Sequence, residues 1–158
     1  MYEIYLTTHF ILMLLWVVPA FYLNFKLLKN YPVATADKKL TILESVQRIS
    51  DKTELLASSL LPLVGILMII DQRMFLREGT IHIKILLALL AIGSYHISRG
   101  KLRKLIATWK AGESVIGQTR RLAFFRLLTL FLILIIVIIV FQYTGFFRTE
   151  YVVRNWFN

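Results

Sequence analysis

Four long apolar stretches dominate this 158-residue sequence and limit the folds open to it. They cover roughly residues 4–25, 55–71, 80–98 and 127–147. A helix needs about 20 apolar residues to cross the hydrocarbon core of a bilayer. Hydrophobic residues make up 58% of the chain, which is more than a soluble domain of this length could bury. The sequence therefore predicts an all-α, polytopic membrane protein: a four-transmembrane-helix antiparallel bundle that forms one integral membrane domain over residues 1–158.

The second stretch is short, and the residues before it indicate that its helix starts earlier. Leu40, Leu43 and Val46 recur at helical spacing, with charged residues between them. We therefore expect one long helix from about residue 38 to about residue 71, with Asp37 as its N-cap and a bend at Pro62. The third helix should continue past the membrane and turn near Gly112 or Gly117.

The basic residues gather beside particular apolar stretches and predict the direction of the chain. The net charge is +10, and most Lys and Arg residues lie in the links after the first and third stretches. Positive links remain in the cytoplasm, so both termini should lie outside. The same placement favours contact with the lipid bilayer over nucleic acid as the reason for the charge, and we expect no nucleic-acid partner.

Cysteine is absent, and this limits the cofactors that the chain can hold. Disulfides, thiolate zinc sites, cysteine-ligated iron–sulfur clusters and covalent c-type haem are excluded. The sequence also contains no phosphate-cradling glycine loop, HExxH motif or nucleophile elbow. Any cofactor must therefore be bound by His, carboxylate, Met, Tyr or backbone groups.

Three histidines and one lysine lie in or near the spans, where polar groups are costly and need an explanation. His9 and His82 are expected at matching depths in parallel helices, so they could face each other as two axial ligands of a haem iron. His96 follows His82 by 14 residues and should share its helix face, about 21 Å away. The alternative for each histidine is an interfacial residue that bonds to water or a headgroup.

Lys84 is expected to face the inside of the bundle. It could pair there with Asp71, at the same end of the second span. The alternative is that its ammonium group extends outward to the nearby interface.

Parts of the first and third spans resemble the HemJ-type protoporphyrinogen IX oxidases, and CopD-like membrane proteins share a related layout. The matching residues are His9, Trp16, Phe21-Tyr22-Leu23 and Lys26 in the first span, and His82-Ile83-Lys84-Ile85 and Gly93-Ser94-Tyr95-His96 in the third. Two motifs of that family are missing: its Met-Glu-Arg-Arg stretch entering helix two and its Asn-Glu-x-Pro turn at helix four. The corresponding segments read SVQRISDKTELL and RLAFFRLLTLF.

The resemblance implies a bacterial inner-membrane protein that binds b-type haem or another tetrapyrrole and acts in redox or haem metabolism. It implies His9, His82 and His96 as cofactor-binding residues, with His9 and His82 on the haem iron, and Lys84 as the catalytic residue. The missing motifs favour a second interpretation, in which the chain is a non-enzymatic accessory subunit of a larger membrane complex or a homo-oligomer. A third is a metal or small-solute protein of the CopD kind. Whether the chain is an enzyme stays open at this stage.

Overall fold

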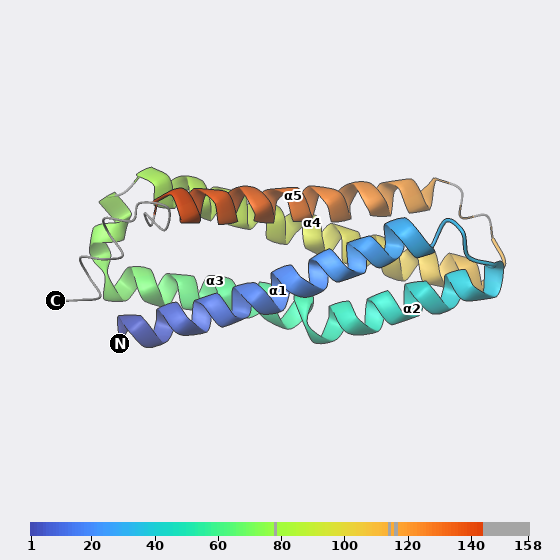
Figure 1. Cartoon of the computed structure of the whole chain (residues 1–158), viewed down its shortest axis with the longest axis horizontal. Coiled ribbons are helices and arrows are strands. Elements are labelled where there is room, and N and C mark those ends of the chain that lie inside the picture. Colours follow the sequence, from blue (N-terminus) through green and yellow to red (C-terminus); the bar gives the residue numbers. More distant parts are fainter. Residues whose placement is uncertain (78, 114, 116, 144–158) are drawn as a thin grey trace.

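The protein is an elongated bundle of helices with alternating directions, as Figure 1 shows. The computed structural model describes residues 1–77, 79–113, 115 and 117–143. Within these residues every regular element is a helix: α1 (Tyr2–Asn30), α2 (Ala36–Lys52), α3 (Glu54–Asp71), the short 3-10 helix η1 (Arg73–Arg77), α4 (Gly79–Lys110) and α5 (Gln118–Tyr143). The predicted all-α class is confirmed.

Four helical segments are long and apolar enough to cross a membrane: Tyr2–Asn30, Ala36–Asp71, Gly79–Lys110 and Gln118–Val140. These confirm the four predicted spans, except that residues 144–147 of the fourth lie outside the described residues. With 32 residues, α4 is about 48 Å long, which exceeds the hydrocarbon core of about 30 Å. At this length α4 is long enough to extend past the membrane, in line with the prediction for the third span.

The second span differs in detail from its prediction. The helix is interrupted at Thr53, where φ is −111° and ψ is −64°, and it continues through Pro62. The Thr53 hydroxyl donates a 2.9 Å hydrogen bond to the Ile49 carbonyl, a local bond that often bends a helix. The N-cap position is occupied by Thr35, and Asp37 lies in the first turn. The prediction of Asp37 as N-cap was therefore wrong by two residues.

Two packed pairs of helices form the bundle. α1 lies along α3, α4 lies along α5, and the pairs meet through α1 with α5 and through α2 with α4. The α1–α2 and α4–α5 connections lie at one end in Figure 1, and the N-terminus and η1 lie at the other. We call the first end the basic end, because the links with most Lys and Arg residues are there. Gly112 and Gly117 form its turns with φ of +73° and +91°, as predicted.

The core is concentrated toward the basic end and the middle of the bundle. One cluster of buried side chains joins α1, α2, α4 and α5 (Leu23, Leu43, Val46, Leu102, Leu105, Ile106 and Leu122). The other lies at mid-length (Trp16, Ala57, Ala91, Tyr95, Leu132 and Ile133). In the remaining part, residues 2–11, 59–71, 79–90 and 134–140, no residue whose burial is described is fully buried. We call this part the open half, since its helices share little buried surface.

Candidate functional site

His9 lies in the open half and is turned toward the neighbouring helix α3. A side chain added at Gly65 would lie 3.6 Å from Cε1 of His9, and the imidazole lies against the backbone of Leu61. Its buried Nδ1 makes no hydrogen bond of good geometry among the described residues, although the Leu61 backbone carbonyl lies close enough to act as a weak acceptor for the ring. A buried ring nitrogen without a partner is costly, and such a group is free to coordinate a metal or to bond to a ligand.

Lys84 of α4 lies close enough to His9 for the two side chains to interact electrostatically, and Lys84 is half-buried. Among the described residues Lys84 forms no ion pair, so the pairing with Asp71 is not made; Asp71 is exposed at the end of α3. Thr80 lies one turn before Lys84, and its hydroxyl oxygen is buried without a partner in the described structure. The inward orientation predicted for Lys84 agrees with this arrangement.

His82 lies in the same half of the bundle but in a different setting from His9. It is exposed, and its Nε2 is 3.0 Å from the Leu76 carbonyl oxygen, so Nε2–H donates to the backbone of η1 in the tautomer that makes this bond. To act as a second axial ligand through Nε2, His82 would have to leave Leu76. The pairing of His9 with His82 stays a prediction.

His96 is exposed on α4, toward the basic end, beside a different set of residues. Its ring contacts Tyr95 edge-on, with ring centroids 5.3 Å apart. His96 therefore lies on the outside of the bundle at a different level from His9. The structure brings His9 and Lys84 together and leaves His96 apart from them.

The deepest charged groups in the described structure are Glu54 and Arg126, which form an ion pair inside the bundle. Their side chains are only 2% and 3% exposed. Nη2 of Arg126 donates to both carboxylate oxygens of Glu54, at 3.1 and 3.3 Å. Nε and Nη1 of Arg126 are buried and have no partner among the described residues. The pair joins the first turn of α3 to α5, and the positive end of the α3 dipole also favours the carboxylate.

A layer of polar side chains surrounds this ion pair. The Tyr95 hydroxyl lies 3.1 Å from the Ser50 hydroxyl, and the Thr129 hydroxyl donates to the Ser94 hydroxyl at 3.0 Å. Trp16 contacts Tyr95 edge-on, while its buried Nε1 lacks a partner in the described structure. The hydrogen bonds tie α2, α4 and α5 together at mid-length, close to where α2 and α3 meet.

The sequence interpretation missed this ion pair. The predicted spans over 55–71 and 127–147 begin one residue after Glu54 and Arg126, so each charge lies at the edge of a predicted span, where it needs no partner. α5 begins at Gln118, however, and so Arg126 is two turns inside the helix. Two opposite charges, each within an apolar helix and at matching depth, were the signal that could have found it.

The described residues contain no group of three or more His, Asp or Glu side chains that could hold a metal ion. A haem iron takes only one or two ligands from the protein, so a haem site does not need such a group. Of the candidate ligands, His9 is the one with a buried ring nitrogen, Nδ1, that makes no hydrogen bond of good geometry among the described residues.

Comparisons with protein-family models, with curated proteins and with solved structures found no match for this chain.

Proposed function

We propose that this chain is a multi-pass membrane protein that binds a tetrapyrrole in its open half, with b-type haem as the first candidate. The observation that carries the proposal is the inward His9 ring, whose buried Nδ1 makes no hydrogen bond of good geometry among the described residues and which lies close to Lys84. The resemblance to the HemJ-type oxidases involves the same two residues. The proposed role is in redox or haem metabolism.

Each residue has a chemical role in this proposal. His9 supplies an imidazole nitrogen to the iron. Lys84 is an ammonium group without an ion-pair partner in the described structure, and it would pair with a carboxylate of the tetrapyrrole. No residue whose burial is described in the open half is fully buried, so a ligand there would not have to displace a fully buried side chain. A bound haem supplies one-electron chemistry, and the protein supplies binding and orientation.

The first test is an absorption difference spectrum between reduced and oxidised protein, with a pyridine haemochrome assay. The protein should be purified in mild detergent from cells with ample haem. We expect a b-type spectrum at close to one haem per chain. A colourless protein with no haemochrome signal would contradict the proposal.

The proposal includes a location and an orientation. The chain would lie in the bacterial inner membrane, with the basic end in the cytoplasm and both termini outside, as the distribution of Lys and Arg favours. Because the chain has no cysteine, single-cysteine variants report this directly. We expect an impermeant maleimide to label Glu3→Cys in spheroplasts and to label Glu113→Cys only after permeabilisation. The reverse pattern would show the opposite orientation.

A second candidate is a non-enzymatic accessory subunit in a larger complex or homo-oligomer. It is favoured by one face of α4, where Gly93, His96 and Gly100 are all exposed and a side chain added at either glycine would meet nothing within 4 Å. Small residues allow a second helix to approach closely, and an exposed histidine can bond to it. Such a subunit would be colourless alone and would co-purify with a defined assembly.

A further inference from the structure

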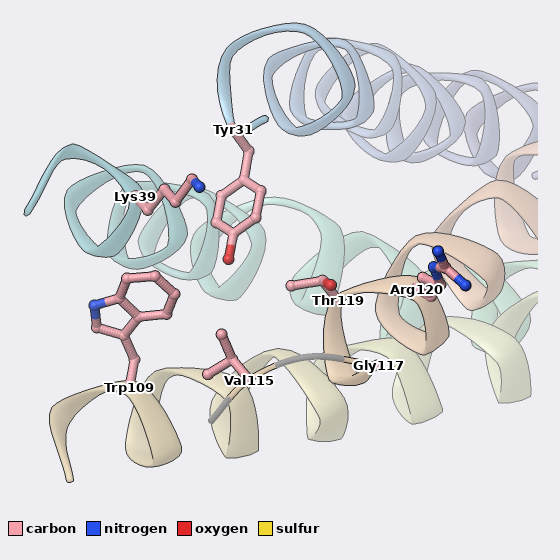
Figure 2. A pocket seen from close by; sticks show the side chains of 7 residues that line it. All are labelled: Tyr31, Lys39, Trp109, Val115, Gly117, Thr119 and Arg120. Carbon is pink, nitrogen blue, oxygen red and sulfur yellow. The ribbon is translucent and has the colours of Figure 1, made fainter. Parts of the chain in front are cut away.

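A pocket at the basic end lies far from His9 and has no part in the proposed function. Its volume is about 380 Å³, within the range of small-ligand sites. It is lined by Tyr31, Lys39, Trp109, Val115, Gly117, Thr119 and Arg120. These residues come from the end of α1, from α2, from the end of α4, from the α4–α5 link and from the start of α5, so the pocket lies where the four helices converge (Figure 2).

The charge of the lining is positive. Lys39 and Arg120 line the pocket, and none of its described lining residues is acidic. Neither forms an ion pair with a described residue, whereas Lys110 at the same end pairs with Glu44 at 2.8 Å. In Figure 2 the exposed Arg120 guanidinium is directed away from Lys39 and Tyr31, so it would have to turn inward to contact a ligand. Two cations at the rim of one concave site, both without an ion-pair partner among the described residues, favour an anionic ligand.

Neutral donors add to this charge. The pocket includes Gly117 and Thr119, which flank the start of the 26-residue helix α5. The Gln118 and Arg121 N–H groups already donate to the Val115 and Gly117 carbonyls, so in the described structure the Thr119 and Arg120 N–H groups are the ones that a ligand could use. The helix dipole also places positive charge there. Figure 2 shows the Tyr31 hydroxyl directed toward the side of the pocket that holds Val115 and Thr119. Burial raises the pKa of Tyr31, so this hydroxyl stays protonated and can donate.

Aromatic faces complete the lining. Lys39 Nζ lies 5.6 Å from the centroid of the Tyr31 ring, and this contact holds the ammonium group at the pocket wall. Trp109 lies on the opposite side in Figure 2 and leaves an apolar surface for the organic part of a ligand. The combination of two cations, a helix start and hydroxyl donors matches a phosphate group with its negatively charged oxygens.

We propose that this pocket binds a phosphate ester, in which the phosphate contacts Lys39, Arg120 and the start of α5. The phosphate could belong to the headgroup of an anionic phospholipid or to a soluble phosphorylated molecule. This inference is independent of tetrapyrrole binding.

The test uses the full chain in lipid nanodiscs and has two arms. In the first, the protein is placed in nanodiscs of phosphatidylcholine with phosphatidylglycerol. Native mass spectrometry then measures how much phosphatidylglycerol remains bound to the protein. In the second, nanodiscs of phosphatidylcholine alone are titrated with glycerol 3-phosphate, and tryptophan fluorescence is followed. Retained phosphatidylglycerol alone identifies the headgroup, and saturable glycerol 3-phosphate binding alone identifies a soluble ligand.

The pocket variant is Lys39→Gln with Arg120→Gln. Its matched control is Lys38→Gln with Arg121→Gln, which removes the same charge from two exposed neighbours outside the pocket lining. We expect the pocket variant to lose affinity by about tenfold or more, as removal of a charge-assisted hydrogen bond does. The control should bind as the unmodified chain does. Equal thermal unfolding temperatures of the two variants would show that the fold is intact.

Two results would overturn the inference. One is the absence of binding in both arms. The other is an equal loss in the pocket variant and its control, which would show that only the overall positive charge attracts the anion. Tyr31→Phe gives a further check, because it keeps the ring beside Lys39 and removes only the hydroxyl; we expect a smaller loss than in the double variant.

Discussion

Replacing Glu54 by glutamine is expected to destabilise the protein by about 3–5 kcal/mol. The substitution keeps the size of the side chain but removes the negative charge beside Arg126, whose side chain is 3% exposed. The guanidinium would then be a buried charge without compensation, and two of its nitrogens already lack partners among the described residues. Reversible unfolding in detergent, followed by circular dichroism, measures the change.

The control for this prediction is Glu44→Gln. Glu44 also pairs with a cation, Lys110, at 2.8 Å, but both side chains are about half exposed. Exposed pairs contribute about 0–1 kcal/mol, so this variant should be nearly as stable as the unmodified chain. A double variant, Glu54→Leu with Arg126→Met, should recover most of the loss because apolar residues replace both charges. Equal effects of Glu54→Gln and Glu44→Gln would contradict the buried ion pair.

The second large effect is expected at His9. In the proposed site, His9→Ala removes the imidazole ligand, and we expect haem affinity to fall by about tenfold or more, which is about 1.4 kcal/mol or more. The measurement is the haem content of protein purified in parallel, by the pyridine haemochrome assay. His96→Ala is the control, because His96 is exposed and at a different level of the bundle. Full haem retention in His9→Ala would contradict the role of His9.

His82→Ala then decides between one and two histidine ligands. If this variant loses haem as His9→Ala does, His82 leaves the Leu76 carbonyl in the loaded protein and acts as the second ligand. If it keeps its haem, His9 is the histidine ligand alone. Lys84→Met should weaken binding of a carboxylate-bearing porphyrin while leaving the iron ligand in place.

The four spans were predictable because lipid makes a simple demand on sequence: long apolar stretches and internally bonded backbone. The break in the second span was not predictable. The bend expected at Pro62 stays a prediction, since α3 continues through that residue, whereas the helix is interrupted at Thr53, where no Gly or Pro stands. Local geometry of this kind depends on which neighbours the chain meets, and that information is not contained in one segment.

The same limit applies to the site. Residue type and depth were enough to single out His9 and Lys84, because polar groups inside a span are rare. The partners of these groups depend on the rotation of each helix about its axis. A shift of one residue turns a helix by 100°, and that angle separates a His9 that faces Gly65 from one that faces lipid. Glu54 and Arg126 were overlooked for a different reason, since each looked like the end of a span.

The uneven packing of the bundle has a consequence for how a molecule would reach His9. Stability in a protein is distributed as its buried contacts are, and here these lie at mid-length and toward the basic end. Local separation of the helices in the open half would therefore cost much less free energy than unfolding. A lipid-soluble molecule could enter sideways from the bilayer between the helices, without passing through water, while the opposite end of the bundle holds the fold together.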